Sequence, residues 1–156
     1  MTNNVYVIGA GKLGCQIANN LSKEGFNVTI VDLTNEVFNK IQDFSGFTRV
    51  ADFTNPSALD NFNLDNLSML IVVTGDDNKN IFIADMCNYM FRIKDIYIRL
   101  YDSNKEKLIT SENIHSICPF LLSIKYFDSL KIQEKNWYES SNIKWAWRSR
   151  LHYKNV

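Results

Sequence analysis

The stretch VYVIGAGKLGCQIANNLSKEGFNVTIVD, residues 5–32, decides the fold class of this chain. It begins with a short apolar run, long enough for one buried strand and too short for a helix. A G-x-G-x-x-G pattern follows at Gly9, Gly11 and Gly14, and apolar residues then recur at helical spacing. A second apolar run ends at Asp32. The order strand, glycine turn, helix, strand and terminal acid predicts a βαβ unit with a nucleotide site.

Each part of this motif has a physical role in nucleotide binding. Gly9 lets the chain turn sharply, Gly11 removes the side chain that would block a phosphate, and Gly14 lets the helix pack closely on the sheet. The first N–H groups of that helix have no internal partner, so they can bind a phosphate. Asp32 can accept hydrogen bonds from both ribose hydroxyls. In the alternative interpretation, Asp32 only caps the next helix.

The composition is that of one ordinary globular domain. The chain has 156 residues, 46% of them hydrophobic, and its 17 Lys and Arg residues balance 17 Asp and Glu residues. This balance gives no support for a nucleic acid partner. No segment has the apolar length of a membrane span or the pattern of a signal peptide, and the three cysteines have no zinc spacing. We therefore expect a soluble, cytoplasmic chain that is not inserted in a membrane and holds no metal.

The rest of the chain alternates predicted strands and helices. Strands are predicted at 47–50, 69–73, 95–100 and 114–118, and helices after Asp32, from Pro56, at 78–91 and from Pro119. The 78–91 helix is apolar on several sides, so we expect it to be largely buried. Ser103 and Glu106 form a predicted capping box. The alternation predicts an α/β fold, a Rossmann-like doubly wound parallel sheet with ligands at the carboxyl ends of its strands.

Six segments together resemble a known family. They are VIGAGKLG (7–14), Asp32, ADFT (51–54), VVTGDDNKN (72–80), IYIRLYD (96–102) and IHSICP (114–119). In order and spacing they are similar to the amino-terminal lobe of RCK domains, the regulators of potassium conductance, also called TrkA-N domains. The resemblance covers roughly residues 4–130. It implies a nucleotide sensor that forms dimers or octameric rings and governs a potassium channel or transporter. Ligands in that family include NAD(H), ATP, ADP and AMP.

The resemblance also assigns candidate binding residues. The phosphate turn is Gly9, Ala10, Gly11, Lys12 and Leu13, and the ribose position is Asp32 with Leu33 beside it. Asp52 and Phe53 resemble the family pair beside the adenine, with the backbone of Phe53 at the base edge. Thr74, Gly75 and Asp76 would line the far side of the nucleotide. Arg99 would lie near the phosphates or the subunit interface. No residue is assigned a catalytic role.

Several of these residues have structural alternatives. Asp76 is expected to act first as a helix cap, Lys12 could be a solvated lysine, and Arg99 could form an ion pair with Asp76 or Asp102. Phe53 stands where the family commonly has alanine, so its ring could stack on the base or crowd it. Since a carboxylate at Asp32 should repel a 2′-phosphate, NAD is predicted over NADP. Asp32 does not separate NAD from AMP, ADP or ATP.

We divide the chain into a nucleotide-binding domain, residues 1–130, and a carboxyl-terminal tail, residues 131–156. The tail carries all three tryptophans and a surplus of basic residues. It could fold back as a cover for the sheet, but aromatic and arginine residues favour contact with an oligomer or partner. Because little sequence follows the last predicted helix, we expect the usual carboxyl-terminal RCK lobe to be missing from this chain.

The sequence thus predicts a non-catalytic regulatory subunit that binds an adenine nucleotide or NAD(H). Its partner would be a membrane potassium transporter or channel subunit, which would place it at the inner face of the membrane. It would form a homodimer or higher ring, with or without a second RCK-type chain. One alternative is an NAD-dependent oxidoreductase, although the chain has no room for a substrate domain and no evident acid–base group. Another is a purely structural partner of a second RCK-type chain.

Overall fold

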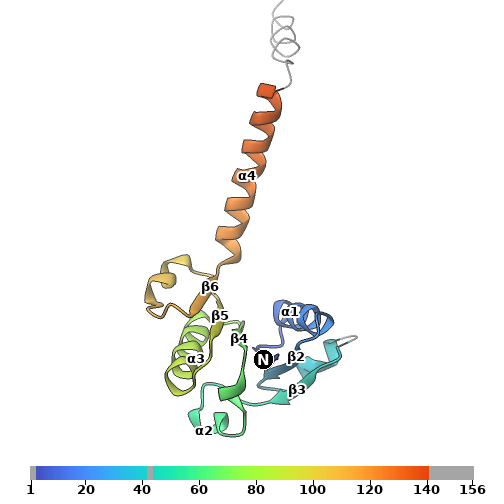
Figure 1. Cartoon of the computed structure of the whole chain (residues 1–156), viewed down its shortest axis with the longest axis vertical. Helices are drawn as coiled ribbons and strands as arrows, with labels where there is room; N and C mark the ends of the chain where they lie inside the picture. The colour runs from blue at the N-terminus through green and yellow to red at the C-terminus, as the bar shows by residue number, and fades with distance from the viewer. Residues whose placement is uncertain (1–2, 42–43, 141–156) are drawn as a thin grey trace, which may run out of the picture. The chain divides into compact units, whose positions relative to one another are not determined.

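The computed structural model describes residues 3–41 and 44–140. The chain divides into two compact units, Met1–Cys118 and Pro119–Val156. The first unit holds the sheet and the candidate site, and the second is described here only as its helix α4. Figure 1 shows the helices and strands that make up each unit. Among the described residues, no helix is long and apolar enough to cross a membrane.

The first unit is built on a six-stranded sheet in which every neighbouring pair is parallel. Its strands are β1 (Asn4–Ile8), β2 (Asn27–Asp32), β3 (Phe47–Val50), β4 (Met69–Val72), β5 (Asp95–Arg99) and β6 (Ile114–Ile117). Their order is β3-β2-β1-β4-β5-β6. The chain therefore builds outward from β1 to β3 and then crosses back to β4 on the other side of β1. This reversal next to β1 is where doubly wound sheets bind ligands.

Short and long helices connect these strands. The α-helices are α1 (Lys12–Lys23), α2 (Pro56–Leu59) and α3 (Asp77–Met90), and the 3-10 helices are η1 (Glu36–Lys40), η2 (Leu64–Asn66) and η3 (Ser103–Leu108). Helix α1 ends as the sequence predicts, because Gly25 follows it with a φ of +90°. Helix α2 begins at Pro56, and the Asn55 side chain accepts from the Ser57 N–H at 3.1 Å.

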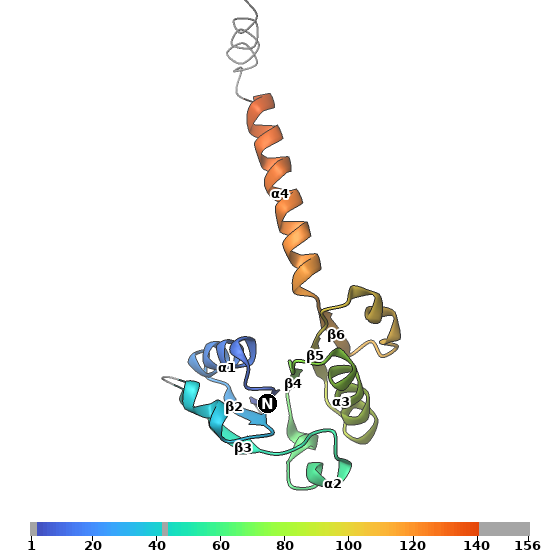
Figure 2. The same ribbon diagram turned by 180° about the vertical axis from the view of Figure 1, so that it is seen from behind.

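Two apolar clusters form the core, one on each face of the sheet. Val5 and Val7 of β1 pack with Ala18 of α1 on one face. Ile8 at the end of β1 packs with Ile83 and other residues of α3 on the opposite face. The alternation along β1 thus sends successive side chains to different helices, which is the packing of a doubly wound sheet. Figure 2 shows the same arrangement from behind, with α1 and α3 apart.

Three local predictions need correction. Asp102, rather than Ser103, caps η3, since its carboxylate accepts from the Asn104 N–H at 2.9 Å and Glu106 instead accepts from the Ser116 hydroxyl. The segment after Asp32 forms only the short 3-10 helix η1. The 78–91 helix is not buried on all sides, as the following residues show.

Helix α3 buries one face and exposes another. Ile83, Ala84 and Cys87 are in the core, whereas Phe82 is 50% and Tyr89 92% exposed. The helix covers only one side of the sheet, so residues that point away from the sheet have no cover within the first unit. Burial raises the pKa of the Cys87 thiol to about 12.

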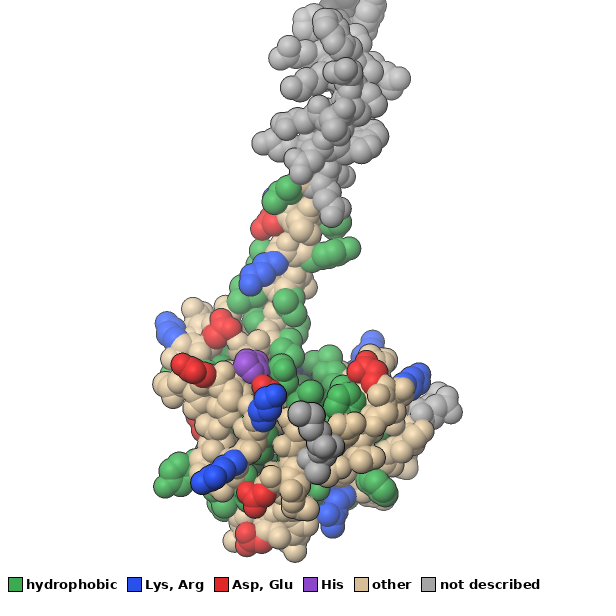
Figure 3. All heavy atoms as spheres, in the orientation of Figure 1, with side chains coloured by type: hydrophobic (Ala, Val, Ile, Leu, Met, Phe, Trp, Pro, Cys, Tyr) green, Lys and Arg blue, Asp and Glu red, His purple; other side chains and the backbone are tan. Residues whose placement is uncertain are grey.

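Helix α4, Pro119–Ser140, begins at the predicted proline and is rich in exposed apolar side chains. Phe120, Ile124 and Phe127 recur at helical spacing on one face. Leu122, Tyr126 and Leu130 recur in the same way on a second face. Figure 3 shows green hydrophobic side chains along this helix. The tail from residue 141 onward lies outside the described residues.

Candidate functional site

The turn between β1 and α1 has a geometry that requires glycine at two positions. Gly9 has a φ of +106°, and a Cβ placed there would lie 2.9 Å from the Val73 carbonyl oxygen. A Cβ on Gly14 would lie 1.9 Å from the Gly9 carbonyl oxygen, so the helix approaches the turn as closely as predicted. Both glycines are therefore needed to build the turn itself.

Gly11 is different, because a Cβ on it would meet no atom within 4 Å. Its φ of −70° and ψ of 179° suit any residue. Gly11 caps α1, and the first N–H to bond back into the helix is that of Cys15, which donates to the Gly11 carbonyl at 2.9 Å. The preceding N–H groups of α1 have no intrahelical acceptor. The space left by Gly11 and these donors form a cradle suited to an anion.

Asp32 lies at the end of β2 and is bonded to this turn. One carboxylate oxygen accepts from the Ala10 N–H at 2.6 Å, and the other accepts from the Leu33 N–H at 2.7 Å. Asp32 does not cap η1, whose N-cap is Asn35. A carboxylate has about four acceptor positions, so both oxygens can still accept from hydroxyl groups. Leu33, beside it, is 55% exposed.

Asp52 and Phe53 follow β3 and point in different directions. The Asp52 carboxylate accepts from the Thr54 hydroxyl at 2.6 Å and from the Thr54 N–H at 2.9 Å. These bonds hold the pKa of Asp52 below its ordinary value, with the hydroxyl bond as the largest cause. Phe53 is only 2% exposed, and its ring packs edge-on against Phe62 with centroids 4.9 Å apart. The ring belongs to the core in this structure, so it does not offer a face for stacking on a base.

The opposite wall of the site is made by the loop after β4. Asp76 caps α3 and accepts from the N–H groups of Asn78 and Lys79 at 2.8 and 3.0 Å. These bonds, that from Lys79 first, lower the pKa of Asp76. The Thr74 N–H donates to the Asn80 side-chain oxygen at 3.0 Å, and the Thr74 hydroxyl donates to the same oxygen. The two hydrogen bonds that Asp76 accepts confirm the helix cap predicted for it.

Arg99 lies at the end of β5 and contacts this wall. Its guanidinium donates to the Thr74 carbonyl at 2.9 Å and lies 4.3 Å from the centre of the Tyr101 ring. Its Nε is buried without a hydrogen-bond partner. Within the described part of the chain Arg99 forms no salt bridge with Asp76 or Asp102, so the structural ion pair considered for it is absent there.

Two buried polar residues organise this wall and were not recognised as such in the sequence. Asn80, fully buried, donates to the Arg99 carbonyl at 2.8 Å while it accepts from Thr74. Asp77, 7% exposed, accepts from the N–H groups of Tyr101 and Asp102 at 2.9 and 3.0 Å. Together they fasten the first turn of α3 to the ends of β4 and β5. A polar residue at a helix start gave no signal of burial, because caps are ordinarily exposed.

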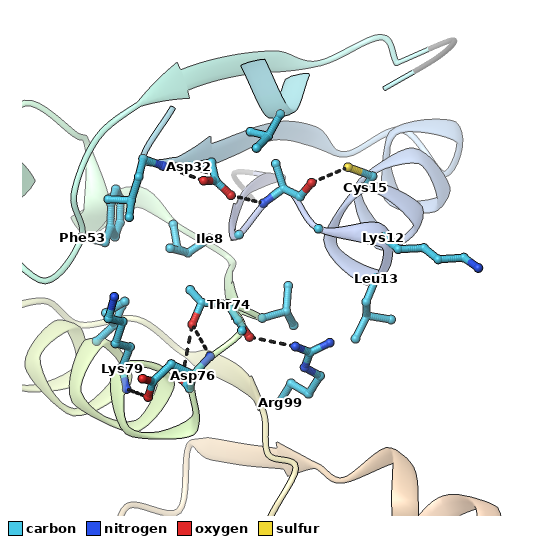
Figure 4. Close-up of a pocket in the computed structure, with 18 of the residues that line it drawn as sticks. Ile8, Lys12, Leu13, Cys15, Asp32, Phe53, Thr74, Asp76, Lys79 and Arg99 are labelled. Carbon is cyan, nitrogen blue, oxygen red and sulfur yellow. Dashed lines mark hydrogen bonds between the residues drawn. The ribbon is translucent and has the colours of Figure 1, made fainter. Parts of the chain in front are cut away.

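All the predicted binding residues lie around one cavity of about 1040 Å³, at the carboxyl ends of the strands. They are Gly9, Ala10, Gly11, Lys12, Leu13, Asp32, Leu33, Asp52, Phe53, Thr74, Gly75, Asp76 and Arg99. Figure 4 shows Asp32 and Thr74 on facing walls, with the Lys12 side chain extending away from both. The cavity also reaches Gln16, Lys79 and Tyr101, which the sequence did not assign. Its volume suits a nucleotide or a dinucleotide.

Cys15 contributes a neutral thiol to the edge of this cavity. Its sulfur donates to the Ala10 carbonyl at 3.1 Å. Burial, and then the negative charge of Asp32, raise the pKa of Cys15. Among the described residues no group of three or more His, Cys, Asp or Glu side chains could hold a metal ion.

The model of the TrkA-N domain family matches residues 5–119. The chain belongs to the TrkA-N domain family. The Trk system potassium uptake protein TrkA homolog of Pyrococcus horikoshii is 28% identical over 105 residues, which cover 67% of this chain and 46% of that protein. The chain thus spans about half the length of this curated relative.

Solved structures share the fold of this TrkA-N domain. The TrkA-N domain of inner membrane protein ybaL from Escherichia coli superposes with a TM-score of 0.72 at 12% identity, over 83% of this chain and 97% of that one. The GsuK channel bound to NAD matches with a TM-score of 0.64 at 11% identity, over 76% of this chain and 22% of that one. These superpositions show a common fold, and its Rossmann-like parallel sheet is the one that the sequence predicts.

Proposed function

We propose that this TrkA-N chain is a non-catalytic regulatory subunit that binds an adenine nucleotide or NAD(H) and controls a potassium channel or transporter. The observation that carries the proposal is the convergence of an open glycine cradle, the Asp32 carboxylate and the loops after β3 and β4 on one cavity. Support for the potassium role comes from the name of the P. horikoshii relative, a potassium uptake protein.

The order of these groups along the cavity sets how a nucleotide would lie. Phosphates would occupy the cradle at Gly11, where free N–H groups and the positive end of α1 favour an anion. The ribose would lie at Asp32, and the base would continue past Leu33 toward the Asp52–Phe53 backbone. Asp32 would accept from a 2′-hydroxyl and repel a 2′-phosphate, so NAD is expected to bind better than NADP.

Assembly is part of the same proposal. A helix that is apolar on two faces needs more than one partner surface, since exposed apolar patches mark interaction sites. Helix α4 has such faces, so we expect the chain to form a homodimer or higher ring, alone or with a second RCK-type chain. The assembly would act on a membrane potassium transporter or channel subunit from the cytoplasmic side.

Thermal unfolding with a nucleotide panel tests the ligand. The purified chain would be melted with AMP, ADP, ATP, NAD, NADH and NADP, each about a hundredfold above a micromolar affinity. Selective binding to the folded state at that excess adds about 2.7 kcal/mol to its stability, a clear shift in Tm. We expect a shift with adenine nucleotides or NAD(H), and a smaller one with NADP.

The other outcomes separate the alternatives. Equal shifts with NAD and NADP would contradict the role given to Asp32. No shift with any nucleotide would contradict the proposed role as a nucleotide sensor. It would favour the alternative that the chain is a structural partner of a second RCK-type chain. Turnover of NAD(H) with a metabolite panel, above the background rate, would instead favour the oxidoreductase.

A further inference from the structure

Lys79 enters the cavity from the wall opposite Asp32. It is the third residue of α3, and its backbone N–H is bonded to Asp76 at 3.0 Å. On either side of it in the sequence, Asp77 and Asn80 are buried and fastened to the loops after β4 and β5. The backbone of Lys79 is therefore held in place by its neighbours, without any help from its own side chain.

The side chain of Lys79 reaches toward the base end of the cavity. Figure 4 shows it running from α3 in the direction of Phe53, and Lys79 lines the cavity. In the part of the chain that the structure describes, its ammonium makes no hydrogen bond and no salt bridge. Its positive charge adds to the Thr54 hydrogen bonds in lowering the pKa of Asp52.

The other two cations of the cavity do not lie in this position. The Arg99 guanidinium donates to the Thr74 carbonyl and lies over the Tyr101 ring. The Lys12 side chain extends away from the cavity (Figure 4). The Lys79 ammonium is thus a hydrogen-bond donor without an acceptor among the described residues, on the side of the cavity near the loop after β3.

We propose that Lys79 is a base-contacting residue, whose ammonium donates a hydrogen bond to an acceptor atom on the edge of the bound purine. The inference rests on the proposed function and adds a specific contact to it. With phosphates at Gly11 and ribose at Asp32, the heterocycle is the part of the ligand that extends toward Lys79. Purine ring nitrogens are acceptors, and an ammonium has only donors, so the two are complementary.

The alternative is that Lys79 binds phosphate, and the two roles differ in a measurable way. A base contact is the same in adenosine, AMP, ADP and ATP, because these ligands share the base and differ in phosphate number. A phosphate contact instead gains strength as phosphates are added, since each one adds negative charge.

The test is calorimetric titration of the four ligands into the wild type, Lys79→Met and Lys94→Met. Methionine keeps the length of the side chain and removes both the charge and the donors. Lys94 is exposed and outside the cavity, so its variant controls for the loss of one positive charge. We expect Lys79→Met to weaken all four ligands by one common factor of about ten, which corresponds to one charge-assisted hydrogen bond. Lys94→Met should bind as the wild type does.

Four results would overturn the inference. A loss that grows from adenosine to ATP would make Lys79 a phosphate contact, and unchanged binding would leave it without a role. Equal losses in both variants would show an effect of net charge. Failure of the wild type to bind any of the four ligands would also overturn the inference. It would overturn the proposed function only together with a failure to bind NAD(H), whereas the preceding results leave the proposed function standing. A melting curve of Lys79→Met without ligand checks that the variant is folded.

Discussion

At the scale of single residues, the three glycines of the first turn have different physical roles although they belong to one pattern. Gly9 and Gly14 are required by the protein itself, through a positive φ and through contacts that a Cβ would violate. Gly11 has an ordinary backbone conformation and empty space where a Cβ would be. No described residue requires glycine at that position, whereas a bound phosphate would.

Gly11→Ala therefore separates binding from folding. We expect its Tm to stay within a degree or two of the wild type, or to rise slightly, because alanine restricts the unfolded chain. Nucleotide-induced stabilisation should be lost, since the methyl group would fill the phosphate cradle. Thermal unfolding with and without ligand measures both.

Gly9→Ala is the matched control for this experiment. It should destabilise the protein by more than about 1 kcal/mol, because the positive φ and the Val73 carbonyl oppose a Cβ. Retention of full nucleotide binding by Gly11→Ala would show that no phosphate occupies the cradle.

At the scale of elements, α3 and η3 are joined through one buried carboxylate. Asp77 accepts from two backbone N–H groups in the loop after β5, and Lys105 of η3 lies 3.9 Å from it. This arrangement joins the helix that carries one wall of the cavity to the segment beyond Arg99. Removal of the carboxylate would leave two partly buried donors without an acceptor.

Asp77→Ala is expected to lower the free energy of unfolding by about 2–3 kcal/mol, the range for a charged acceptor and the donors it leaves unpaired. Urea denaturation measures the change. Asp102→Ala provides the comparison, because Asp102 is an exposed cap of η3 and its loss should lower the free energy of unfolding by less than the loss of Asp77 does. Equal costs for the two variants would mean that the buried hydrogen bonds of Asp77 stabilise the fold no more than an exposed cap does.

The sequence predicts elements better than it predicts the direction of side chains. Strands β1 and β4 follow from the local apolar runs VYVI and MLIV, and the start of α2 follows from Pro56, so these elements could be predicted. The capping box at Ser103 failed because Asp102, one residue earlier, caps η3 and the Glu106 carboxylate accepts from Ser116 instead. Burial of α3 was overestimated because its composition does not tell which faces are covered.

The candidate site also divides into residues that local sequence places and residues whose direction depends on packing. The glycine turn and Asp32 lie in one contiguous stretch of the chain, where spacing fixes their geometry. Phe53, by contrast, could have faced the base or the core, and only its packing on Phe62 decides. Asn80 and Lys79 depend on which side of the first turn of α3 faces the sheet, a choice made by tertiary contacts rather than by local sequence.

At the scale of the whole molecule, helix α4 stands out because many of its apolar side chains are exposed. Its exposed apolar residues lie on two faces, which predicts self-association. We expect light scattering to show a dimer or larger species, and Phe120→Glu combined with Phe127→Glu to reduce the mass toward the monomer. Lys125→Glu alone is the control for added negative charge on the same helix, because it changes the net charge by as much as the two Phe→Glu substitutions do. A monomeric wild type at high micromolar concentration would contradict the expected assembly.

The hydrogen bonds around the cavity have a consequence for how a signal could be encoded. Asp32 is bonded to Ala10 within one wall, and Thr74 is bonded to Asn80 and Arg99 within the other. Each wall is thus already ordered before a ligand arrives, so a ligand confined to one wall changes little beyond its own occupancy. A ligand that touches both walls also fixes the separation between them. Two ligands of equal affinity but different reach would then carry different information, and span rather than binding strength would determine the response.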